Sequence, residues 1–144
     1  MALDVGTKTI GIAISDPLRM FPQPHSTLSR EGVRKDVDRL APLARSLDVS
    51  ELVVGLPLEL DGTESRSARL ARQVGEALGT QLDMRPVYID ERFSSVEAER
   101  WLLQADLSRK RRKEVIDQAA AVVILRSYLD HGDWTRDADS GEGS

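Results

Sequence analysis

Residues 1–16 read MALDVGTKTIGIAISD. Apolar residues at 1–5 and 10–15 flank a Gly-Thr-Lys-Thr segment, which predicts two antiparallel strands joined by a turn. Asp4 interrupts the first strand with a carboxylate. An ionised side chain is costly to bury unless it is paired or bound to a metal. We therefore expect Asp4 to face a cation rather than to have a purely structural role.

The rest of the chain predicts helices that alternate with strands. Helical spacing of apolar residues indicates helices at 33–47, 64–78, 96–103 and 112–129. Short apolar runs indicate strands near 26–28, at 52–56 and at 86–89. The resulting order, β-β-β-α-β-α-β-α-α, predicts an α/β fold. Its mixed sheet has five strands, three antiparallel and then parallel, with helices on both faces.

The net charge of −4 is confined to the C-terminal end of the chain. Residues 130–144 hold five acids and one arginine, whereas residues 1–129 hold 19 acids and 19 basic residues. We expect a folded domain at 1–129 and an acidic, disordered tail at 130–144. Within the neutral part, five consecutive cations form a basic loop, Arg109, Lys110, Arg111, Arg112 and Lys113. A solvated loop is the simplest explanation, but the run favours phosphate contact.

Composition excludes several kinds of site. The chain has no cysteine, so disulfides and thiolate metal sites are excluded, and His25 and His131 are too far apart in sequence to favour zinc. Any metal should therefore be a hard ion held by carboxylates, Mg²⁺ or Mn²⁺. We expect no membrane association and a cytoplasmic location, because no membrane-spanning run or signal peptide is recognisable. With only six aromatic residues, base stacking is weakly supported, and Trp101 is better explained as a core residue.

Three further acids stand where they could join Asp4. Asp90 and Glu91 end the last strand, and Asp117 lies in the final helix beside an alanine-rich apolar face. Functional residues gather at the carboxyl ends of parallel strands, but alternation points Asp90 and Glu91 to opposite faces, so at most one joins Asp4. Clustered carboxylates repel unless metal ions compensate them, as in two-metal phosphodiester hydrolysis. The simpler alternatives are ordinary surface acids at 90–91 and a helix-dipole acid at 117.

Four segments together resemble the YqgF family, also called RuvX. They are DVGTKTIGIAISD at 4–16, VVGLPLELDGT at 53–63, DERFSSVEA at 90–98 and RKEVIDQAAAVVILRSYL at 112–129. The resemblance covers nearly all of residues 1–129 and implies a ribonuclease H-like fold related to the RuvC resolvases. Departures from the family pattern are the Phe-Ser-Ser at 93–95 in place of Leu-Thr-Thr, Ser65-Arg66, Arg126 and the short stretch before Asp4. None of them removes an expected metal ligand, and the last suggests a natural start further upstream.

The resemblance also implies roles for individual residues. The family's acids fall on Asp4, Glu91 and Asp117, which would hold Mg²⁺ or Mn²⁺. Lys8 and Arg92, with Thr7, match positions that contact phosphate or support the site. The family is described as one of Holliday junction resolvases and of nucleases that mature the 5′ end of 16S pre-rRNA.

These observations leave three functions to compare. The leading one is a metal-dependent endonuclease acting on pre-rRNA or branched DNA, in ribosome biogenesis or recombination. A resolvase that cuts symmetrically should be a homodimer. The second is a non-catalytic, nucleic-acid-binding ribosome-assembly factor. The third is an actin-like ATPase, suggested by the Asp-x-Gly-Thr turn, but such enzymes need two domains and a second such turn, which this chain lacks.

Overall fold

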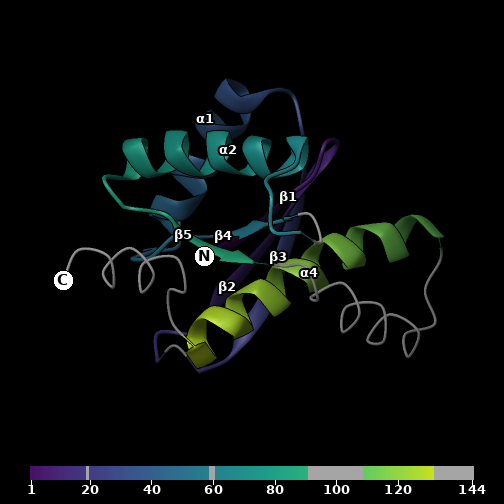
Figure 1. Cartoon of the computed structure of the whole chain (residues 1–144). Helices are drawn as coiled ribbons and strands as arrows, with labels where there is room; N and C mark the ends of the chain where they lie inside the picture. The colour runs from purple at the N-terminus through teal and green to yellow at the C-terminus, as the bar shows by residue number, and fades with distance from the viewer. Residues whose placement is uncertain (19, 59–60, 91–108, 132–144) are drawn as a thin grey trace.

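The computed structural model describes residues 1–18, 20–58, 61–90 and 109–131. Its centre is a five-stranded sheet in the order β3-β2-β1-β4-β5 (Figure 1). The strands are β1 (Ala2–Val5), β2 (Thr9–Ser15), β3 (Pro22–Ser29), β4 (Val53–Leu56) and β5 (Val87–Asp90). The pairs β1–β2 and β2–β3 are antiparallel. The pairs β1–β4 and β4–β5 are parallel. The predicted mixed sheet is therefore confirmed.

Helices cover both faces of this sheet, as predicted. Helices α1 (Val33–Ser46) and α2 (Arg66–Leu82) lie together on one face, and α4 (Arg109–His131) crosses the other (Figure 1). Strand alternation divides the core accordingly. Leu3 and Val54 belong to the cluster under α1 and α2. Ala2, Val53 and Ile89 belong to the cluster under α4.

Two elements differ in extent from their prediction. β3 begins at Pro22, not at residue 26, because it is an edge strand where a missing backbone N–H costs no ladder hydrogen bond. α2 begins at Arg66 and continues to Leu82. Its N-cap is Ser65, whose hydroxyl oxygen accepts a hydrogen bond from the Ala68 N–H at 3.2 Å.

The basic run at 109–113 lies in α4, so its prediction as a loop is wrong. Lysine and arginine are good helix formers, and five of them in succession carry no helix-breaking signal. The predicted helix at 96–103 lies outside the described residues.

The C-terminal boundary also differs slightly. α4 continues through Asp130 to His131, so the first two residues of the predicted tail are helical. Residues 132–144, the rest of that segment, lie outside the described residues. Among the residues that the structure describes, no helix is both long and apolar enough to span a membrane.

Candidate functional site

Asp4 lies in a row of residues that crosses all five strands on the face covered by α4. Its partner on β2 is Gly11, and the partner of Gly11 on β3 is Thr27. On the other side, β1 and β4 pair in parallel up to Leu3 and Val54, so continuing this register places Gly55 beside Asp4. Gly55 pairs with Ile89 on β5. Asp4 itself is half-buried.

Two glycines flank Asp4 in the sheet. Side chains of directly opposed strand residues normally stand about 5 Å apart and touch. Gly11 and Gly55 carry no side chain, so the residues directly opposed to Asp4 on β2 and β4 place no side chain beside it. Glycine inside a strand often marks close approach of a ligand or another backbone. Sequence reasoning missed this pair, whose signal was an isolated glycine within each apolar strand.

Helix α4 passes over this row at Gln118. The Gln118 side-chain amide donates a hydrogen bond to the Thr27 hydroxyl at 3.1 Å. Asp117 is the preceding residue, so its backbone lies only about 1.5 Å further along the helix axis. Ala121 and Ile124 are buried against the sheet, and the helical period assigns position 117 to the same stripe. The structure thus brings the segment that carries Asp117 over the row of Asp4, while the position of its carboxylate stays a prediction.

The other predicted acids divide between the two faces of the sheet. Asp90 is exposed at the end of β5 and shares strand parity with Tyr88, which packs under α1 and α2. Asp90 therefore lies on the face opposite to Asp4. Glu91, the predicted ligand, and Arg92 lie outside the described residues. The described residues contain no group of three or more potential metal ligands, but neither Glu91 nor the side chain of Asp117 is described.

The turn after β1 presents the predicted phosphate-contacting residue Lys8. The Gly6 N–H donates to the Thr9 carbonyl at 2.8 Å and closes the turn, and Lys8 is exposed at its tip. The turn is attached to β3 through the Arg30 N–H, which donates to the Lys8 carbonyl at 2.9 Å. For Arg109, Lys110, Arg111, Arg112 and Lys113 the structure gives the helical backbone only.

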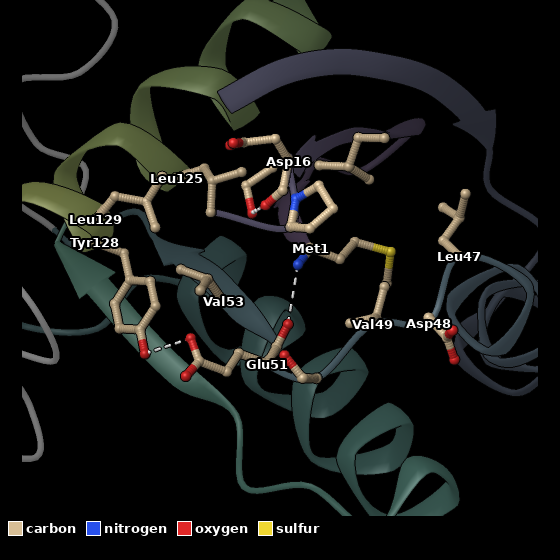
Figure 2. Close-up of a pocket in the computed structure, with 14 residues that line it drawn as sticks. Met1, Asp16, Leu47, Asp48, Val49, Glu51, Val53, Leu125, Tyr128 and Leu129 are labelled. Atoms are coloured by element: carbon tan, nitrogen blue, oxygen red, sulfur yellow. Dashed lines mark hydrogen bonds between the residues drawn. The ribbon is translucent and has the colours of Figure 1, made fainter. Parts of the chain in front are cut away.

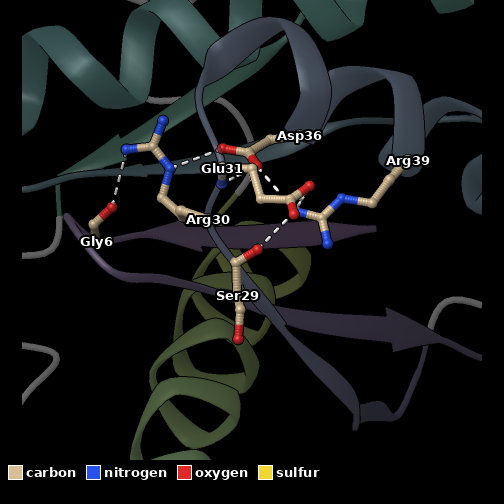
Figure 3. A network of polar contacts seen from close by, with 6 residues as sticks. All are labelled: Gly6, Ser29, Arg30, Glu31, Asp36 and Arg39. Carbon is tan, nitrogen blue, oxygen red and sulfur yellow. Dashed lines mark hydrogen bonds and ion pairs between the residues drawn. The ribbon is translucent and has the colours of Figure 1, made fainter.

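A buried ion pair supports this turn (Figure 3). Arg30 Nε donates to Asp36 Oδ2 at 2.9 Å, with side-chain exposures of 8% and 0%. The other arm of the guanidinium donates to the Gly6 carbonyl at 3.2 Å. Arg30 therefore links the start of α1 to the turn that follows Asp4. Sequence reasoning missed it, because the contact joins segments 24 residues apart.

Asp36 also holds the segment that leads into α1. The N-cap of α1 is Gly32, which offers no side chain. Asp36 Oδ1 accepts from the Glu31 N–H, just before the helix, at 2.8 Å and from Arg39 at 3.0 Å. Burial by itself raises the pKa of Asp36, but the hydrogen bonds from Glu31, Arg30 and Arg39 outweigh it and hold the pKa below its usual range.

A cavity of about 380 Å³ lies at the opposite end of the sheet (Figure 2). It is lined by Met1, Asp16, Glu51 and Tyr128, among others, near the amino ends of β1 and β4. The Met1 amino group donates to the Glu51 carbonyl at 2.9 Å, and the Tyr128 hydroxyl donates to Glu51 Oε2 at 2.8 Å. None of the predicted site residues lines this cavity, so concavity alone does not identify the candidate site.

Comparison with known proteins gives results consistent with this geometry. Residues 1–131 match the family described as "RuvX: Holliday junction resolvase". A relative from Syntrophomonas wolfei is 48% identical over 137 residues, covering 95% of this chain and 97% of the relative. One from Myxococcus xanthus is 45% identical, covering 90% of this chain and 86% of the relative. Both carry the name "Putative pre-16S rRNA nuclease".

Solved structures of similar fold include "T. thermophilus RuvC in complex with Holliday junction substrate". Its TM-score is 0.54 at 13% sequence identity, and the match covers 94% of this chain and 92% of the other. At this identity the likeness concerns the fold alone. It confirms the predicted ribonuclease H-like architecture.

Proposed function

Because this chain belongs to the RuvX family of Holliday junction resolvases, we propose that it is a metal-dependent endonuclease acting on structured nucleic acid. It is a nuclease, an enzyme that hydrolyses phosphodiester bonds. Its proposed substrate is 16S pre-rRNA, as the names of its relatives suggest, cut at its 5′ end, or branched DNA; its proposed location is the cytoplasm. The observation that carries the proposal is the glycine-flanked Asp4 beneath the α4 segment that contains Asp117.

The donor set suits a hard divalent cation. Asp4, Glu91 and Asp117 would hold Mg²⁺ or Mn²⁺, since carboxylate oxygens are the ligands that these ions prefer. When bound, the ions neutralise the charge that develops on the phosphoryl oxygens during hydrolysis. Gly11 and Gly55 leave room for ions and for the approaching phosphodiester backbone beside Asp4.

The basic side chains would bind the substrate and take no part in the hydrolysis itself. Lys8, exposed after β1, would contact a phosphate next to the bond that is cut, and Arg92 would contact another. The run Arg109, Lys110, Arg111, Arg112 and Lys113 occupies the first turns of α4. Its middle lies about 10 Å along the helix axis from Gln118, the residue above the Asp4 row. A single nucleic-acid strand can therefore contact both the basic run of α4 and the site at Asp4.

The test is cleavage of 16S pre-rRNA and of a four-way DNA junction with Mg²⁺, with Mn²⁺ and with a chelator. We expect cleavage only with metal, and its loss in Asp4→Asn, which keeps the side-chain volume but removes the charge. The control is Asp83→Asn, the same change at the exposed C-cap of α2, where φ is 54° and asparagine is well tolerated. Unchanged cleavage by Asp4→Asn would refute the catalytic assignment.

The same experiment separates the main alternative. A non-catalytic ribosome-assembly factor predicts salt-dependent binding that survives Asp4→Asn, with no cleavage under any metal. Symmetric cutting of a junction also requires two active sites related by symmetry. Sedimentation of the chain on a junction should therefore show two copies if branched DNA is the substrate, and one copy per RNA would favour pre-rRNA.

A further inference from the structure

A groove runs between the turn after β1 and the first two turns of α2. Its volume is about 710 Å³, and its lining residues are Thr7, Arg66, Ser67, Arg69, Leu70 and Gln73. Most of these residues are polar or charged, and none is an acid. Such a lining suits an anionic ligand more than an apolar one.

Two arginines of this groove have unused hydrogen-bonding capacity. Arg66 and Arg69 are exposed, and neither guanidinium makes a hydrogen bond or ion pair with any residue that the structure describes. Arg30, Arg39 and Arg72, by contrast, are each paired with a carboxylate. The five N–H donors on a guanidinium match phosphate oxygens well, and no described residue competes with an external anion for these two arginines.

The nearest acids along the chain are already engaged. Glu64 forms an ion pair with Arg72, one turn beyond the groove arginines. Asp61 Oδ1 accepts hydrogen bonds from the Thr63 N–H at 3.0 Å and from the Thr63 hydroxyl at 2.7 Å. The positive charge of the groove is therefore not cancelled by these neighbours.

The helical spacing presents the groove residues along one side of α2. Arg66, Arg69 and Gln73 follow one another at i, i+3 and i+7, which places them on one stripe of a helix. The rise between the two arginines is about 4.5 Å along the axis. Two guanidinium groups at this spacing can contact neighbouring phosphates of one strand.

The groove adjoins the end of the sheet where Asp4 lies. Thr7 is in the turn that directly follows β1, and α2 follows the carboxyl end of β4 in the chain. A strand with one phosphate beside Asp4 can therefore continue over the turn and into the groove. The groove lies on the α2 side, whereas the basic run of α4 lies on the opposite face of the sheet (Figure 1).

We propose that this groove binds the phosphodiester backbone of the substrate away from the cleaved bond, with Arg66 and Arg69 as the phosphate contacts. The inference rests on the proposed function for the identity of the ligand. It assigns the nucleic acid two contact surfaces, one on each face of the sheet. The enzyme would thereby hold a nucleic-acid strand that bends around the end of the sheet at Asp4, as branched or looped substrates do.

The test is equilibrium binding by the double variant Arg66→Gln/Arg69→Gln. Binding is measured in the Asp4→Asn background without divalent metal, so that cleavage does not interfere. Fluorescence anisotropy with labelled single-stranded RNA, single-stranded DNA and a four-way DNA junction gives Kd between 50 and 200 mM salt. The matched control is Arg126→Gln, an exposed arginine on α4 that lies outside both the groove and the proposed site.

The expected result is a smaller dependence of affinity on salt. Loss of two phosphate contacts should reduce the slope of log K against log[salt] by about 1.4 for single strands and about 1.8 for duplex arms. Affinity should fall roughly 10- to 100-fold, with thermal unfolding unchanged. Equal changes for RNA and DNA support backbone recognition, and a change for only one identifies that nucleic acid as the ligand.

Two results would overturn the proposal. One is an unchanged salt slope for every probe, and the other is an equal change in the Arg126→Gln control. Neither result depends on catalysis, because binding is measured without divalent metal. Cleavage by Asp4→Asn would refute the catalytic assignment and leave the groove intact, so the two failures are distinguishable.

Discussion

Replacing Asp36 by alanine should destabilise the protein strongly, although Asp36 is not one of the proposed metal ligands. The carboxylate is fully buried and accepts hydrogen bonds from Arg30, Glu31 and Arg39 (Figure 3). Its removal leaves the Arg30 guanidinium, only 8% exposed, without its counter-ion. Breaking a buried ion pair by removing one partner costs about 3–5 kcal/mol.

The contribution of Arg39 is small by comparison. Its side chain is 39% exposed, and pairs of this kind contribute less than about 1 kcal/mol. The expected cost therefore comes mainly from Arg30 and from the unsatisfied Glu31 N–H. For a chain of this size, a loss of about 3–5 kcal/mol lowers the unfolding temperature by roughly 10–20 °C.

The assay is urea unfolding at pH 7, followed by circular dichroism, with Asp38→Ala as the matched control. Asp38 lies on the same helix and is exposed, and it accepts one side-chain hydrogen bond, from Gln81 at 3.3 Å. Its removal should change the unfolding free energy by less than about 0.5 kcal/mol. An Arg30→Ala/Asp36→Ala double variant should be less destabilised than the sum of the single variants. Equal effects of Asp36→Ala and Asp38→Ala would refute the reasoning.

The pH dependence of this effect has a definite sign. The pKa of Asp36 is lower in the folded protein than in the unfolded chain, because its hydrogen bonds outweigh the cost of burial. Its stabilising contribution is therefore fully present above the unfolded pKa of about 3.9 and is lost as pH falls through the folded pKa. The difference in unfolding free energy between the native protein and Asp36→Ala should be constant from pH 5 to 7 and shrink below pH 4. A difference that grows on acidification would contradict this.

Two glycine substitutions test the sheet and its helix. Gly11→Ala puts a methyl group about 5 Å from the Asp4 Cβ, and we expect cleavage of either substrate to fall about 100-fold with an unchanged circular dichroism spectrum. Full activity would show that the space beside Asp4 is not used. Gly79→Ala puts a Cβ 2.6 Å from the Met84 carbonyl and 2.9 Å from Pro86 Cδ, which should cost about 1–3 kcal/mol in urea unfolding. Unaltered stability would mean that this contact relaxes freely.

The local pattern of the sequence was sufficient for most of the fold. Strict apolar runs at 10–15 and 52–56 correspond to β2 and β4, and helical spacing located α1 and α2 to within a few residues. These elements follow from periodicity because each buries one face against a common sheet. The predicted start of α4 was wrong, because a run of charged residues has no apolar periodicity even where it forms a helix. The predicted length of β3 was wrong, because the position of a strand at the edge of a sheet cannot be read from apolar periodicity.

The candidate site was predictable only in part. Asp4 could be isolated from sequence, since a carboxylate within an apolar strand is unusual. Gly11 and Gly55 are visible in the sequence as isolated glycines within apolar strands, but their position beside Asp4 could not be predicted, because it depends on the register between strands. The Arg30–Asp36 pair was missed for the same reason: its function arises from contact with the Gly6 carbonyl, which is distant in sequence.

The most direct test of the central claim is a crystal structure of the protein with Mn²⁺. The anomalous signal of manganese identifies the ion independently of its coordination. We predict an ion on the α4 face of the sheet, with an Asp4 carboxylate oxygen at roughly 2.1 Å, as for similar hard divalent cations, and with Glu91 and Asp117 as further ligands. Manganese bound elsewhere, with Asp4 not among its ligands, would contradict the account.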